Sequence, residues 1–168
     1  MGRSQRPADA IYQYTGPDFT SATSPYTTSD FVSASFQLPA ALGSNLTGFT
    51  VCGGTITCTI PFSVSDGVEN VTNANSLLVN FNEISTNANA LPTQWSFSNE
   101  FGMAGSFIDS GIRVGEDSAN RKPQGSAFTT YTPGPQYWSV VPVPEPSTLK
   151  LVGISLSLLT VVRRRDRV

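Results

Sequence analysis

Residues 31–38 alternate apolar and polar side chains more regularly than any other stretch of the sequence. In a β-strand, side chains two positions apart point to the same face. One face of this strand would therefore carry Val32, Ala34, Phe36 and Leu38. Pro39 would end the strand, because proline cannot donate a ladder hydrogen bond. Since no stretch between residues 11 and 142 has the 3.6-residue apolar spacing of an amphipathic helix, we expect β structure throughout this part.

Short strands of this kind are expected along the whole body, separated by glycine, asparagine and proline turns. Besides 31–38 they fall at residues 11–14, 49–52, 55–60, 62–65, 68–71, 77–84, 93–98, 112–114, 127–131 and 137–141. Gly53-Gly54 and Asp66-Gly67 would each turn a hairpin, and residues 116–125 have the polar composition of an exposed loop. The pattern predicts an all-β fold, either a single β-sandwich or a jelly-roll-like domain.

The length of the sequence, 168 residues, suits one domain followed by a tail. We expect a leader at residues 1–10, a body at 11–142 and a tail at 143–168. The leader lacks the apolar core that a signal peptide needs. We therefore expect the true gene start to lie further upstream.

Charge and composition exclude several classes of function for the body. Residues 8–142 contain three basic and ten acidic side chains, a net charge of −7, which would repel a phosphate backbone and argues against nucleic-acid binding. The sequence contains no histidine, so neither a Ser-His-Asp triad nor a Cys-His nucleophile can form. A Cys/His zinc site is excluded for the same reason, and no cofactor is expected.

Carboxylate pairs remain the one route to catalysis, since a glycosidase needs only two acids across a cleft. Asp66 and Glu69 flank a predicted turn, and Glu116 adjoins Asp117. In both pairs we favour a turn or a solvated loop over catalysis. Glu116, Asp117 and Asn120 offer the oxygen ligands that calcium prefers, but their spacing is not that of a calcium-binding loop.

Four aromatic residues of the body could stack on sugar rings. They are Trp95, Tyr131, Tyr137 and Trp138. Aromatic residues at alternating strand positions more often fill the core, so we favour the core over a sugar site for all four.

The two cysteines, Cys52 and Cys58, lie six residues apart. In an exported protein such a pair favours a small-loop disulfide, which on the chain-entropy model would add about 2 kcal/mol of stability. Two free thiols are the alternative, because spacing alone does not fix the geometry of a disulfide.

The tail has the features of a short membrane span. Residues 147–162 contain one charged side chain, Lys150, and as a helix would span about 24 Å, slightly less than the ~30 Å hydrocarbon core. Its anchoring apolar residues surround the helix and are Leu149, Leu151, Val152, Ile154, Leu156, Leu158, Leu159, Val161 and Val162. The basic end, Arg163, Arg164, Arg165 and Arg167, would stay cytoplasmic. The alternative is an amphipathic or buried C-terminal helix of a soluble domain.

The order of parts in this tail resembles the PEP-CTERM sorting signal of Gram-negative bacteria. Pro144-Glu145-Pro146 matches the motif, the apolar span matches its helix and the arginines match its basic end. Lys150 and Asp166 depart from the pattern without touching the motif. The order of motifs over residues 11 to 100 also resembles a recurrent body type of small PEP-CTERM proteins, which implies no catalytic activity.

The resemblance implies that exosortase, a membrane cysteine transpeptidase, is the partner that cuts near the motif. We expect a non-enzymatic protein of the cell surface or extracellular matrix, held in the inner membrane as a precursor and then moved to the cell surface or released. The first alternative is a module that binds extracellular polysaccharide. The second is a carboxylate-based glycosidase.

Overall fold

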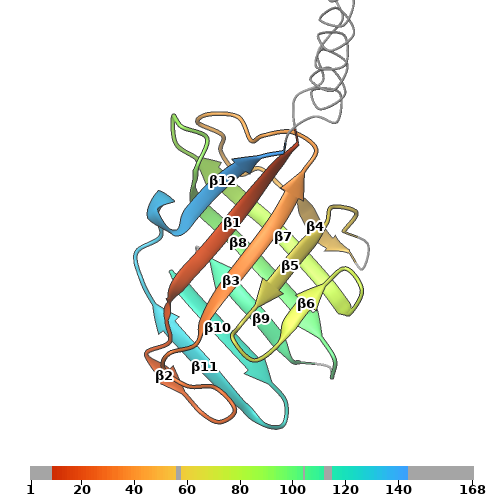
Figure 1. Cartoon of the computed structure of the whole chain (residues 1–168), viewed down its shortest axis with the longest axis vertical. Helices are drawn as coiled ribbons and strands as arrows, with labels where there is room; N and C mark the ends of the chain where they lie inside the picture. The colour runs from red at the N-terminus through yellow and green to blue at the C-terminus, as the bar shows by residue number, and fades with distance from the viewer. Residues whose placement is uncertain (1–8, 56–57, 104, 112–114, 144–168) are drawn as a thin grey trace, which may run out of the picture.

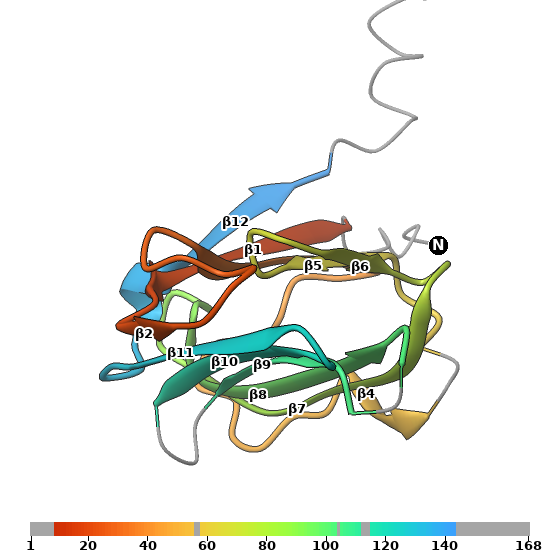
Figure 2. The same ribbon diagram turned by 90° about the horizontal axis from the view of Figure 1, so that it is seen from below.

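Two antiparallel β-sheets pack face to face in the computed structural model (Figures 1 and 2). The structure describes residues 9–55, 58–103, 105–111 and 115–143. The all-β prediction is confirmed over these ranges, in which the one helical element is a 3-10 turn, η1 (Pro135–Tyr137). The sandwich form is confirmed as well.

The first sheet has five strands, and the last strand of the chain lies at one edge of it. Their order is β12 (Trp138–Pro142), β1 (Ala10–Asp18), β3 (Phe31–Leu38), β5 (Phe62–Ser65) and β6 (Asn70–Thr72). All neighbours in this sheet pair antiparallel.

The second sheet has seven strands and lies on the other side of the core. Their order is β2 (Ser21–Ala22), β11 (Gly125–Thr130), β10 (Glu116–Arg121), β9 (Phe107–Gly111), β8 (Pro92–Phe101), β7 (Ser76–Thr86) and β4 (Cys52–Thr55). These neighbours are antiparallel too.

The alternation read in residues 31–38 is confirmed as the inner face of β3. The side chains that it predicted to share a face are all buried, namely Val32, Ala34, Phe36 and Leu38. Phe36 stacks on Phe81 of the opposite sheet, with ring centroids 4.1 Å apart. This contact joins the two sheets at the centre of the core.

β7 changes face at Glu83, which the uniform alternation predicted for residues 77–84 did not allow. Val79 and Phe81 are buried, and then Ile84 and Thr86 are buried instead of residues 83 and 85. Glu83 has a φ of 55°, and the register with β8 shifts between residues 82 and 85. A bulge of this kind inserts one residue and so exchanges the two faces of the strand.

Two other local predictions are wrong. Residues 116–125 were expected to form a loop, but 116–121 form β10, whose inner face buries Asp117 and Ala119. Gly53-Gly54 were expected to turn a hairpin, but they lie inside β4, where the register with β7 shifts between Cys52 and Thr55. The packing of neighbouring strands outweighed weak local preference in both places.

The hairpin predicted around Asp66-Gly67 is present, with a longer turn. β5 and β6 pair up to Ser65 and Asn70, so four residues connect them. Gly67 takes a φ of 88°, a conformation that glycine adopts without steric cost.

Candidate functional site

The chain leaves the sandwich at one end, which we call the exit end (Figure 1). Ala10 at the start of β1 pairs with Leu38 at the end of β3 and with Pro142 at the end of β12. The N–H of Val143 then donates to the carbonyl of Asp9 at 2.8 Å. The backbone is therefore attached to the body up to residue 143, directly before the expected motif.

The sorting motif and the membrane segment expected from the sequence lie outside the described residues. This holds for Pro144, Glu145 and Pro146, for the apolar residues between 147 and 162, and for the arginines from Arg163 to Arg167. Within the ranges that the structure does describe, no helix is long and apolar enough to cross a membrane. The expected leader, residues 1–8, is likewise not described.

Two loops form the surface of the exit end, the crossover loop (residues 39–51) and the β7–β8 loop (residues 87–91). The N–H of Leu42 donates to the hydroxyl of Tyr12 at 2.8 Å. Thr86 Oγ1 accepts from the N–H of Leu46 at 2.9 Å and donates to the carbonyl of Gly43 at 2.7 Å. The crossover loop is thus bonded to both sheets.

An apolar groove of about 400 Å³ opens in this surface. Its lining includes Leu38, Leu42, Leu46, Phe49, Val51 and Ile60. None of the described residues that line it is charged, and Phe49 is 43% exposed. The nearest strand of the first sheet, β3, ends at the groove, so the groove lies close to the point where the chain leaves.

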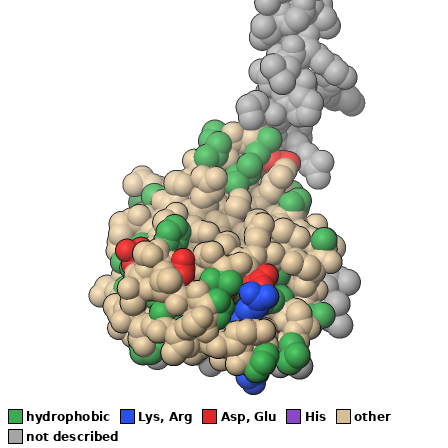
Figure 3. Space-filling view, turned by 60° about the horizontal axis from the view of Figure 1, so that its bottom comes forward, with side chains coloured by type: hydrophobic (Ala, Val, Ile, Leu, Met, Phe, Trp, Pro, Cys, Tyr) green, Lys and Arg blue, Asp and Glu red, His purple; other side chains and the backbone are tan. Residues whose placement is uncertain are grey.

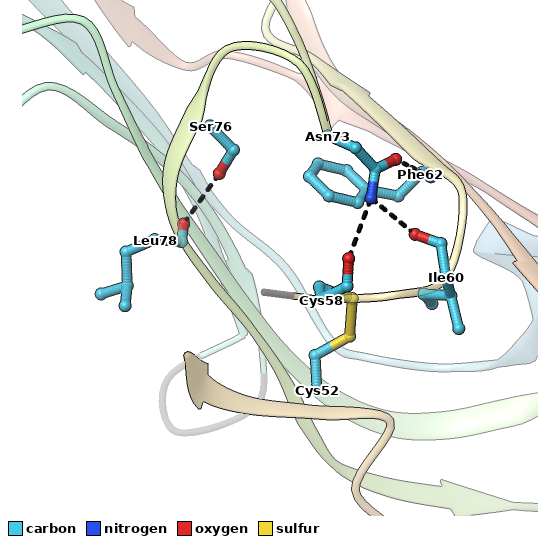
Figure 4. Close-up of a disulfide and its surroundings, with 7 residues drawn as sticks. All are labelled: Cys52, Cys58, Ile60, Phe62, Asn73, Ser76 and Leu78. Carbon is cyan, nitrogen blue, oxygen red and sulfur yellow. Dashed lines mark hydrogen bonds between the residues drawn. A yellow bond between two sulfur atoms is a disulfide. The ribbon is translucent and has the colours of Figure 1, made fainter. Parts of the chain in front are cut away.

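A disulfide between Cys52 and Cys58 is present, with Cα atoms 5.6 Å apart, so the pairing expected from the sequence is confirmed. Asn73 holds the second half of this loop (Figure 4). Its Nδ2 donates to the carbonyls of Cys58 at 3.1 Å and Ile60 at 2.8 Å, and its Oδ1 accepts from the N–H of Phe62 at 3.0 Å. Val51 and Ile60, which flank the disulfide loop, are therefore fixed as one wall of the groove.

Of the two neighbouring acids Glu116 and Asp117, Asp117 is the buried one, and it faces the core. Its carboxylate accepts from the hydroxyl of Tyr14 at 2.7 Å and from that of Tyr131 at 2.8 Å. The two tyrosine oxygens are themselves 2.8 Å apart. A Cβ at Gly16 would overlap Asp117 Oδ2, so a side chain cannot be accommodated there without movement.

Burial raises the pKa of Asp117 from its ordinary value to about 6, because the charged form loses its hydration. The hydroxyls of Tyr14 and Tyr131 oppose this rise by stabilising the carboxylate. The pKa values of both tyrosines are raised, first by burial and then by the neighbouring carboxylate. These groups form a closed polar network within the core rather than a reactive site on the surface.

The carboxylate pairs do not form a catalytic cleft in the described part of the chain. Glu116 and Asp117 are neighbours on a strand, so their side chains point to opposite faces. Asp66 accepts from the backbone N–H groups of Val68 at 2.9 Å and of Glu69 at 2.7 Å, which holds the turn. Glu69 pairs with a guanidinium nitrogen of Arg121 at 2.7 Å.

The calcium candidate fails on the same geometry. Glu116 and Asn120 lie on the outer face of β10, whereas Asp117 lies on the inner face. No group of three acids, cysteines or histidines suited to a metal ion occurs among the described residues.

The aromatic residues considered for sugar stacking gather in one cluster at the core. Trp95 and Trp138 are buried, with ring centroids 5.4 Å apart. Tyr131 and Tyr137 lie 5.0 Å apart and are only partly buried. Trp95 Nε1 donates to Ser110 Oγ at 2.9 Å, which explains how its indole N–H is satisfied inside the protein. The two tryptophans are therefore not available to a surface ligand.

The apolar groove was missed by the sequence reasoning. The signal that could have revealed it is the crossover loop itself, thirteen residues from Pro39 to Val51 without a charge. The network of Asp117 was missed because its partner Tyr14 is 103 residues away in the sequence.

Comparison of the chain with protein-family models, with curated proteins and with solved structures gives no match.

Proposed function

We propose that this chain is an exported surface or matrix protein that an exosortase sorts and processes through Pro144-Glu145-Pro146. The observation that carries this proposal is the position of the motif. Pro144 follows directly after Val143, whose N–H is bonded to Asp9 beside β1 of the sandwich. A protease cleft needs an extended, accessible substrate, and two prolines favour that conformation.

The tail beyond the motif would serve as a temporary anchor. Residues 147–162 form the membrane helix in this proposal, with Arg163, Arg164, Arg165 and Arg167 in the cytoplasm. The precursor would then reside in the inner membrane with its body outside. Cleavage would transfer the body to the cell surface or release it.

The body has a structural role in this proposal and no catalytic one. Three acids of the two candidate pairs, Asp66, Glu69 and Asp117, are engaged in a turn, an ion pair and the core network. The disulfide between Cys52 and Cys58 fits a protein that works outside the cytoplasm, where disulfides persist.

The test is the intact mass of the protein recovered from cells that contain an exosortase and from cells that lack it. We expect loss of the mass beyond the motif only when the enzyme is present, and no loss when Pro144, Glu145 and Pro146 are all replaced by alanine. The control is Asp166→Ala, outside the motif, which should be processed as the wild type is. A full-length mass in exosortase-containing cells would refute the proposal.

A polysaccharide-binding role is the second candidate, and one observation favours it. A row of polar side chains crosses the outer face of the larger sheet through Asn80, Ser98, Asp109 and Ser118 and ends at Phe128. Phe128, the last residue of the row, is 46% exposed. An exposed aromatic ring beside polar side chains can stack on a sugar.

A glycan array probed with the tail-cleaved protein tests this second candidate. We expect binding to an extracellular polysaccharide that Phe128→Ala weakens at least tenfold. Phe31→Ala, which removes another exposed ring away from this row, is the matched control. Absence of binding to any matrix polysaccharide would rule the candidate out.

A further inference from the structure

We propose that the exit end of the sandwich rests against the lipid bilayer in the uncleaved precursor, with Phe49 and the apolar groove at the membrane interface. The inference rests on the proposed function, since it takes residues 147–162 to be in the membrane. It adds a second contact between the protein and the membrane, made by the folded body itself.

The length of the tether brings this end to the membrane. Pro142 is paired with Ala10, and the N–H of Val143 is bonded to Asp9. Val143 is bonded to the sandwich and the apolar segment begins at residue 147, four residues later; four extended residues span at most about 14 Å. The exit end must therefore lie within that distance of the bilayer surface in every precursor molecule.

The exit end has the surface that such a position requires. Neither the crossover loop nor the β7–β8 loop contains a charged residue, although Asp9 and Glu83 lie beside them. Leucine, valine and isoleucine side chains line the groove within the crossover loop and beside Ile60, and Phe49 of the same lining is 43% exposed. An apolar groove with an exposed ring in its lining can take up apolar groups.

The opposite end of the sandwich has a different character. Arg121 pairs there with Glu69, and Lys122 and Asp30 lie nearby, against Gly105 and Gly67. Figure 3, in which this end comes forward, shows red and blue side chains on it. The tether and the apolar groove thus coincide at the exit end, whereas the opposite end carries charged side chains among its exposed apolar ones, which include Phe31, Leu77 and Met103.

The bilayer is favoured over another protein because the lining of the groove, apart from Thr50, consists of apolar residues and glycine. A protein interface usually surrounds its apolar centre with a polar rim that fixes orientation, whereas a lipid surface needs only apolar area near the interface. For as long as the tail is uncut, the tether also holds the bilayer beside the groove, so no encounter between separate molecules is needed. A second copy and the exosortase itself are the competing occupants, and the test separates them.

The test measures fluorescence of the full-length precursor reconstituted in phosphatidylcholine vesicles with and without brominated acyl chains. Bromine quenches tryptophan only at short range, and the native Trp95 and Trp138 are buried in the core. In Phe49→Trp we expect at least twofold quenching of the added emission by brominated lipid. Thr47→Trp, on the same loop and exposed, is a second reporter that leaves Phe49 intact.

The matched control is Phe31→Trp. Phe31 is similarly exposed, at 36%, but it begins β3 at the opposite end, about 25 Å away, the length of an eight-residue strand. We expect no quenching at this position. Equal and weak quenching of the reporters at both ends would overturn the inference.

Flotation of the same vesicles separates this inference from the proposed function. Failure of the wild-type precursor to float would remove the membrane anchor, and with it both proposals. If the precursor floats but neither loop reporter is quenched, only the contact between the body and the lipid is overturned. If the emission of a loop reporter shifts to the blue without quenching, and this shift grows with protein concentration, the groove binds a second copy. If the shift appears only when exosortase is added, the groove binds the enzyme. Either result would overturn the assignment of the groove to lipid.

Discussion

Three short contacts between oxygen atoms join Asp117, Tyr14 and Tyr131, two of them to the carboxyl group of Asp117, and these contacts share the protons available. Asp117, Tyr14 and Tyr131 form a closed ring, with distances of 2.7, 2.8 and 2.8 Å. Each contact needs one proton, and the two phenol groups supply only two. The third is supplied when Asp117 itself is protonated. The geometry thus agrees with the raised pKa of this carboxyl group.

The protonation of Asp117 predicts a stability that falls as pH rises. The pKa in the folded state, about 6, lies above the ordinary value of 3.8, so between these values the folded protein holds a proton that the unfolded chain has released. The stabilising contribution is complete below about pH 4 and is lost as pH rises through about 6. A shift of this size corresponds to at most about 3 kcal/mol.

The measurement is urea unfolding of the wild type and of Asp117→Asn at several pH values from 4 to 7. The amide stays neutral over this range, so the free energy of unfolding of the variant should not show this decrease. The stability of the variant relative to the wild type should therefore increase as pH rises. Asp18→Asn, which changes an exposed acid, controls for net charge. Parallel pH curves for wild type and Asp117→Asn would show that Asp117 is not the responsible group.

At the level of elements, the strands could be predicted where alternation is uniform. β3 follows from residues 31–38 alone, since apolar side chains alternate without interruption. β10 could not be predicted, because its polar sequence from Glu116 to Arg121 becomes a strand only between β9 and β11. The bulge at Glu83 also lacks a local signal, because the exchange of faces depends on the register with β8.

The features of the candidate site also differ in whether the sequence alone predicts them. The disulfide could be predicted from two cysteines in a short loop, whereas the groove requires that residues 38–51 and Ile60 come together in space. Asp117 could be named as an acid in the sequence, but its inward direction was hidden by its polar neighbours.

Removing the disulfide should weaken the wall of the groove as well as the whole fold. Replacing both Cys52 and Cys58 with serine restores the entropy of a short loop in the unfolded chain, and we expect a loss of about 2 kcal/mol. Chemical denaturation of the oxidised and reduced wild type beside this variant measures the loss. The reduced wild type should behave as the double variant does; a variant as stable as the oxidised protein would contradict the prediction.

At the scale of the whole molecule, attachment to the membrane should depend on the tail, with the exit end contributing only while the tail is present. The body between residues 8 and 142 carries a net charge of −7, which disfavours binding to anionic lipid. We expect the precursor to float with vesicles at low and high salt, because its anchor is apolar. The tail-cleaved protein should remain in the aqueous phase under both conditions, and its flotation would contradict this division of roles.

The pairing of β1 with β12 also determines how the body responds to mechanical load. The first residue of β1 and the last of β12 are partners, so a force that separates the two termini acts across the hydrogen bonds at that edge one pair after another. Bonds loaded in sequence yield at lower force than bonds sheared together. Pulling from both termini should therefore detach β12 first, and the strand next to the proposed sorting motif would be the mechanical weak point of the body.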